Sequence, residues 1–218
     1  MRVVTLPAPW EELAMGLLRD LFGPSKEEVW SQLAKQIGAD FTDRGFWGGG
    51  GIVRAQVGEW TVTLDTYTVS RGKHRHTYTR LRAPFVNADG FRFQVYRDNF
   101  LWKIGKAFGM QDVEVGHAEF DDAFVIRGSD ESRLRQLFAD DQVRDLLRRQ
   151  PEVCFEVRDD EGFFATKFPQ GVDELHFRVR GVVTDVARLR ALFDLFAATL
   201  DRLTRIGSAY RRDPGVRL

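Results

Sequence analysis

The feature that most constrains this sequence is the alternation of apolar and polar residues in three consecutive segments, 59–69, 75–85 and 91–96. Successive side chains of a β-strand point to opposite faces, so each segment presents one apolar and one polar face. Turn-forming residues separate the segments at 70–73 and 87–90. The pattern predicts an antiparallel β-meander with its apolar face on a core.

Apolar residues spaced by three and four predict helices around this meander. Ser25 is an N-cap candidate for one of them, and Gly38 is placed to end it. The other predicted helices cover 10–22, about 99–108, a pair between Gly128 and Pro151, and about 185–206. Further strands are predicted at 120–126 and, as a second meander, at 153–157, 163–168 and 175–183.

Together these elements predict an α+β fold, with antiparallel meanders packed against helices and a long C-terminal helix across the sheet. We expect a single domain over residues 1–218, because no low-complexity linker divides the chain. Its parts are a helical segment (1–40), a first meander half (52–127) and a second (128–210). The similar element order of the two halves is consistent with an internal duplication, although no repeated residues support one.

Composition argues against several classes of protein. The 32 basic and 32 acidic residues give zero net charge, so we do not expect a nucleic-acid partner. A single cysteine allows neither an intrachain disulfide nor a cysteine-rich zinc site. With no signal-peptide pattern and no apolar run long enough to span a bilayer, we expect a cytoplasmic protein. The glycine-rich stretch 45–51 lacks the Lys-Ser or Lys-Thr of a phosphate-binding loop and is interpreted as a connector.

The polar face of the first meander is the strongest candidate for a binding site. A turn at 70–73 would place Tyr67 near His76, Asp65 near Tyr78, Thr63 near Arg80 and Thr61 near Arg82. Arg92 and Gln94 would extend the face on the third strand. Guanidinium groups bind carboxylates and phosphates as forks, so this surface is suited to an anion or an anionic partner. The candidate ligand-binding residues are Arg80, Arg82, Arg92, Tyr67, Tyr78, His76 and Asp65. The alternative is an ordinary solvated sheet face.

Other residues allow an enzymatic interpretation. His74 and His76 share one strand face, and with Asp65 they would form the site of a metal-assisted hydrolase. The cations Lys73 and Arg75 beside them disfavour a bound metal ion, so no metal and no cofactor are assigned. Asp121 and Asp122 would point to opposite faces of a strand and so form no close carboxylate pair, although nearby acidic residues could join one of them for acid/base work. A nucleophilic cysteine needs a neighbouring base, and the sequence places no histidine beside Cys154.

A third alternative is a carrier of a small apolar ligand. Phenylalanines are frequent in the last third of the chain, and a curved sheet around a long helix can leave an apolar pocket. The same residues also suit a filled core. The leading hypothesis is therefore a non-enzymatic binding protein for a small anion or a protein partner, and the hydrolase and the carrier remain alternatives.

Several segments resemble an uncharacterised family of bacterial proteins of unknown function. They are WTVTLDTY (60–67), YTRLRAPF (78–85), FGMQDV (108–113), FDDAFVI (120–126) and IGSAY (206–210). The resemblance implies a bacterial, cytoplasmic origin. It transfers no activity and no functional residue.

Overall fold

The computed structural model describes residues 24–45, 50–97, 111–159 and 167–218. The helices predicted at 10–22 and about 99–108 lie outside these residues, as does most of the strand predicted at 163–168. None of the helices in the described ranges is long and apolar enough to cross a membrane.

Nine strands of the described residues form one antiparallel sheet, and a tenth pairs with β4. The strand order is β1-β2-β3-β4-β9-β8-β5-β7-β6. The predicted α+β class with antiparallel sheet is confirmed. The strands are β1 (Asp40–Asp43), β2 (Gly51–Val57), β3 (Trp60–Arg71), β4 (His74–Asn87), β5 (Phe93–Tyr96), β6 (Gln111–Asp112), β7 (Val125–Gly128), β8 (Cys154–Arg158), β9 (Val172–Arg180) and β10 (Ala209–Tyr210).

The predicted third strand of the first meander is in a different place. β5 does not pair with β4, because β9 and β8 lie between them. The consecutive meander is instead β2-β3-β4, and neither β1 nor β2 was predicted. The second-half strands β9 and β8 are thus inserted between strands of the first half in one sheet, and the two halves do not form separate meanders.

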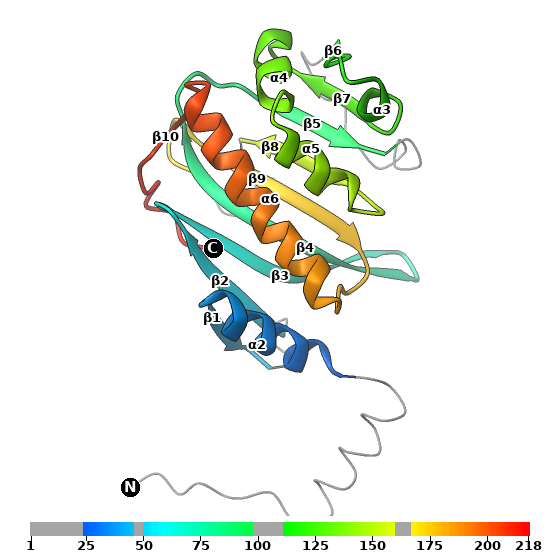
Figure 1. The fold of residues 1–218 in the computed structure, drawn as a ribbon. Helices are drawn as coiled ribbons and strands as arrows, with labels where there is room; N and C mark the ends of the chain where they lie inside the picture. Colours follow the sequence, from blue (N-terminus) through cyan, green and yellow to red (C-terminus); the bar gives the residue numbers. More distant parts are fainter. Residues whose placement is uncertain (1–23, 46–49, 98–110, 160–166) are drawn as a thin grey trace, which may run out of the picture.

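In the part of the chain that the structure describes, five helices accompany the sheet, and Figure 1 shows α2, α5 and α6 in front of one of its faces. The Ser25 side chain accepts from the Glu28 amide and Glu28 reciprocates, which is a capping box, and Gly38 ends α2 in a left-handed conformation. Asp185, where the predicted C-terminal helix begins, is the N-cap of α6, and its side chain accepts from the Arg188 amide. The helices are α2 (Lys26–Ile37), α3 (Ala118–Asp121), α4 (Glu131–Phe138), α5 (Asp141–Arg148) and α6 (Val186–Arg205).

The strand predicted at 120–126 is wrong in its first half. Residues up to Asp121 form the short helix α3, and only Val125 onward is extended. Phe120 and Phe124, four residues apart, pack with ring centroids at 4.7 Å. The Asp121 carboxylate accepts the backbone amides of residues 115, 116 and 117. The acidic pair therefore includes a loop-stabilising aspartate.

The core lies between the sheet and the helices. Leu81 of β4 and Phe177 of β9 are fully buried there. The ring of Phe155 lies 5.7 Å from that of Phe196 on α6. The indole nitrogen of Trp30 on α2 donates to the Val183 carbonyl at 3.0 Å, which fixes this helix to the chain that follows β9. The helices therefore cover the apolar face, and the polar alternates of every strand lie on the other.

Candidate functional site

The β3–β4 hairpin closes through a two-residue turn, Gly72-Lys73, because Arg71 pairs with His74. The expected register is therefore wrong by two residues. The observed partners are Thr63 with Arg82, Asp65 with Arg80, Tyr67 with Tyr78 and Val69 with His76. A shift of two preserves side-chain parity, so the predicted residues of these two strands still share the polar face.

Strand register continues this face into a row of polar side chains across the whole sheet. From one edge to the other, the polar row consists of Asp40, Arg54, Thr63, Arg82, His176, Glu156, Gln94, Arg127 and Asp112. Sequence reasoning missed His176 and Glu156. Both residues alternate with apolar residues in their strands, so their shared polar face could be read from the sequence. Their position beside β4 could not, because the pairing of β9 with β4 joins strands far apart in the sequence.

The centre of the polar face is an ion-pair network. Asp65 is 7% exposed and accepts from Arg80 Nε at 2.5 Å and from Arg82 Nη2 at 2.5 Å. Arg82, one of the candidate ligand-binding residues, is only 4% exposed. A buried carboxylate requires charged partners, and two guanidiniums supply them here. Asp65 and Arg82 are therefore an internal part of the sheet's polar layer.

His176 extends the network toward β8. It is 1% exposed, and its Nδ1 lies 3.6 Å from Glu156 Oε1, beyond hydrogen-bond length. Burial, reinforced by the charges of nearby arginines, lowers the pKa of His176 well below its usual value. Gln94 on β5 donates to Glu156 at 2.7 Å. The imidazole is therefore neutral near pH 7.

The exposed end of the polar face carries the remaining predicted residues of β3 and β4. The Tyr67 and Tyr78 rings stack with centroids at 5.2 Å, and the Arg80 guanidinium lies 4.9 Å from the Tyr67 centroid. From β9, Arg180 Nη2 lies 2.9 Å from His76 Nδ1, and Arg178 hydrogen-bonds with Tyr67. We call Tyr67, His76, Tyr78, Arg80, Arg178 and Arg180 the basic end.

Positive charge exceeds negative charge at the basic end. Among the described residues, no carboxylate forms an ion pair with Arg178 or Arg180. The Arg178 guanidinium instead donates to Cys154 Sγ at 3.3 Å. Burial raises the pKa of this thiol to about 11, so it is uncharged at neutral pH and does not balance the arginine.

Arg178 itself stays charged despite its position. Burial alone would lower its pKa, but the hydrogen bond to Cys154, the charge of the Glu156 carboxylate and the hydrogen bond with Tyr67 outweigh burial and raise the pKa above the usual arginine value. The hairpin adds Lys73 and Arg75, with no acidic residue between positions 66 and 79. The hairpin and the basic end together form a cationic surface on a chain of zero net charge.

Arg92 is separated from the other predicted residues. It precedes β5 and is bound by Asp159 at 2.8 Å and by Asp173 at 3.4 Å. Burial lowers the pKa of Arg92, but these carboxylates outweigh burial and raise it above the usual value. Two acidic partners balance this guanidinium, so it does not extend the basic end.

The metal-site hypothesis receives little support from the geometry. The His74 and His76 rings are stacked with centroids at 6.4 Å, but Asp65 is held by Arg80 and Arg82. Within the described ranges, no group of three His, Cys, Asp or Glu side chains is arranged to hold a metal ion. The space expected for an apolar ligand contains packed rings of Phe155, Phe177 and Phe196, so the carrier hypothesis gains no support there.

Comparison with known proteins yields one distant structural similarity. No protein-family model matches the chain, and no curated protein sequence is significantly similar to it. The fold is similar to the crystal structure of the mycobacterial trehalose monomycolate transport factor A, TtfA, with a TM-score of 0.48 and 10% sequence identity. The alignment covers 82% of this chain and 94% of that one.

Proposed function

We propose that this protein is a non-enzymatic binding protein that takes an anionic group, a phosphate or carboxylate of a ligand or partner, at the basic end of its polar sheet face. The observation that carries the proposal is the charge imbalance there. Arg178 and Arg180 have no ion-pair partner among the described carboxylates, although Asp65 neutralises part of the charge of Arg80 and Arg82.

The aromatic pair supports the same proposal. Tyr67 and Tyr78 are stacked and half-buried beside Arg80. Ring packing and the hydrogen bond of Tyr67 with Arg178 restrict these side chains before a ligand arrives. A binding surface that is already ordered loses less conformational entropy when it binds. Phenolic hydroxyls also donate hydrogen bonds to anionic oxygens.

Titration with inorganic pyrophosphate, followed by NMR of the full chain, tests the proposal. We expect the signals of Tyr67, Tyr78 and His76 to shift, and we expect salt to weaken binding. Arg180→Gln should raise the Kd about tenfold, since a hydrogen bond to a charged group contributes about 1.5–3 kcal/mol.

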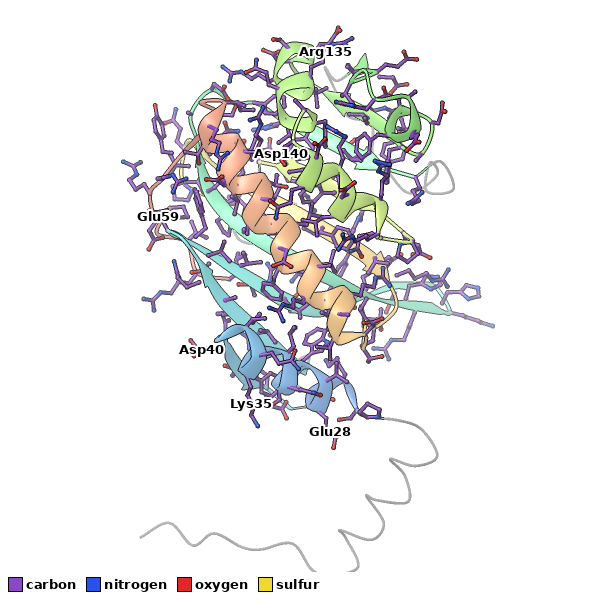
Figure 2. The ribbon with its side chains drawn as sticks, viewed as in Figure 1. Glu28, Lys35, Asp40, Glu59, Arg135 and Asp140 are labelled. Atoms are coloured by element: carbon purple, nitrogen blue, oxygen red, sulfur yellow. The ribbon has the colours of Figure 1, made fainter. Side chains whose placement is uncertain are left out.

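Arg135→Gln is the matched control, because Arg135 is an exposed arginine on α4 (Figure 2) that pairs within its own helix with Glu131. Its Kd should equal that of the unmodified protein. Shifts that avoid the hairpin, or an Arg180→Gln variant that binds as tightly as the control, would contradict the proposal.

A further inference from the structure

The outer part of the β3–β4 hairpin projects beyond its neighbours in the sheet. β3 pairs with β2 as far as Leu64, and β4 pairs with β9 from Thr79 onward. Beyond these residues the two strands continue as a ladder with each other, as far as the turn. Figure 1 shows the hairpin extending past the end of β9. We call residues 68–77 the hairpin tip, which presents its side chains away from the body of the protein.

Two exposed apolar side chains lie beside the cations of the basic end. Val69 is 42% exposed and has the same strand parity as Tyr67, so it lies on the polar face. Val182 is 44% exposed and follows Arg180 of β9 by two residues. The described residues expose one more large hydrophobic side chain, Tyr210 at 57%, on β10, which pairs with the other end of β4. Exposed apolar and cationic side chains therefore occur together at the hairpin.

The charge of this region is positive and distinct from that of the whole chain. Lys73, Arg75 and Arg180 are exposed, and among the described residues no carboxylate forms an ion pair with them. The chain has zero net charge, so the rest of the molecule carries the balancing negative charge. An anionic surface therefore attracts the hairpin and repels the remainder, which orients the molecule hairpin first.

The size of the hairpin tip favours one kind of anionic partner. Its four residue pairs form a face about 14 Å long and about 10 Å wide. A stable protein interface buries about 800 Å² on each side, several times the area of this face. A lipid bilayer needs no matching shape, because it is bound through cations at the headgroups and through apolar side chains that enter the interface.

We propose that the anionic partner of the basic end is the headgroup surface of a bilayer that contains anionic lipids, and that the hairpin tip docks on it. This inference rests on the proposed function, because it names the source of the anionic group. Lys73 and Arg180 bind headgroup phosphates, and Val69 and Val182 enter the interface between headgroups and acyl chains. Tyr67 lies at headgroup depth, where amphipathic rings are favoured.

Sedimentation of the full chain with lipid vesicles tests the inference. The probe is phosphatidylcholine vesicles with about 30% phosphatidylglycerol, and pure phosphatidylcholine vesicles are the reference. We expect the protein to sediment with the anionic vesicles alone, and added salt should release it. Glycerol phosphate at an equal phosphate concentration should leave most of the protein bound, because a soluble phosphate provides no apolar layer for Val69.

Two variants assign the binding to the hairpin. Arg180→Gln should lower the vesicle partition coefficient about fivefold, and Arg135→Gln, whose arginine pairs within α4, should leave it unchanged. Val69→Ser should also lower it about fivefold, because two methyl groups no longer enter the interface. Val69→Ser should leave the Kd for pyrophosphate unchanged. Tyr210→Ser, which removes the exposed apolar side chain on β10, is its control and should change neither quantity.

The outcomes separate this inference from the proposed function. Pyrophosphate binding without vesicle binding would overturn the bilayer inference and leave the anion site standing. Vesicle binding without pyrophosphate binding would support the inference and contradict a site for free anions. Val69→Ser and Arg180→Gln variants that sediment as their controls do would overturn it. Complete release by glycerol phosphate would also overturn it, as would tighter binding to polyglutamate than to vesicles, which would indicate an acidic protein partner.

Discussion

At the scale of single residues, Asp65 is the carboxylate that holds two arginines of the polar face together. Its carboxylate lies between Arg80 and Arg82, and the three side chains are mostly buried. Removing one partner of a buried ion pair leaves an uncompensated charge in a medium that solvates it poorly. The aspartate therefore matters more to stability than a surface residue of the same type.

Asp65→Ala should lower the free energy of unfolding by about 3–5 kcal/mol. The matched control is Asp112→Ala, which removes an aspartate at the same 2.5 Å distance from an arginine, Arg127, but with 67% of the Asp112 side chain exposed. Surface pairs contribute less than about 1 kcal/mol. Urea unfolding measures both variants, and equal losses would show that burial is not the cause.

His176 predicts a pH dependence of stability. Its pKa is lowered in the folded protein, so between the two pKa values the unfolded chain binds a proton that the folded chain does not. The contribution of His176 to the free energy of unfolding is complete above the unfolded-state pKa of about 6.5. As the pH drops below that pKa, the free energy of unfolding falls by up to about 1.4 kcal/mol per pH unit.

His176→Gln should remove this part of the slope between about pH 6.5 and 5 in urea titrations at several pH values. His74→Gln, which replaces an exposed histidine by the same residue, is the control for the substitution itself. A slope that persists in His176→Gln would assign the pH dependence to other groups.

At the scale of elements, the hairpin shows how far sequence reasoning extends. Alternation placed Tyr67, Tyr78 and Arg80 on one face correctly, because side-chain parity is a local property of a strand. The register was wrong because Gly72 and Lys73 close the turn alone, and tight and wider turns share similar residues. Phe120 and Phe124 were assigned to a strand because short apolar runs are ambiguous between strand and helix.

Gly72→Ala tests the geometry of this turn. Gly72 has a φ of 59°, and a Cβ at this position would meet no atom within 4 Å, so the cost is confined to the backbone. We expect a loss of about 1–2 kcal/mol. Lys73→Ala, the neighbouring control, should be close to neutral in thermal or urea unfolding. A neutral Gly72→Ala would indicate that the turn tolerates another conformation.

At the scale of the whole molecule, the decisive feature is the insertion of β9 and β8 between β4 and β5. It brings Arg178, Arg180 and His176 beside the hairpin, across a sequence separation of about 100 residues. Strand neighbours so far apart depend on tertiary packing, and no local pattern encodes them. For this reason the sequence could indicate Arg80 and Tyr78 as residues of the candidate site, but not the two β9 arginines that complete the basic end.

Because strands of the second predicted half are inserted between strands of the first in one sheet, we expect the protein to unfold as one cooperative unit. Tryptophan fluorescence and far-UV circular dichroism should give coincident urea transitions. Two separated transitions would contradict the prediction of a single domain over residues 1–218 and would favour independent units.

Chemical modification of the single cysteine, Cys154, can measure opening motions of the sheet that ligand binding and mutations do not report. Cys154 is 2% exposed on β8, between Tyr96 of β5 and Arg178 of β9. A maleimide or disulfide reagent reaches the sulfur only when these strands separate, so the rate of its modification under native conditions measures how often the middle of the sheet opens. The modification rate of Cys154 therefore reports the opening of the sheet at the place where strands of the two predicted halves are paired.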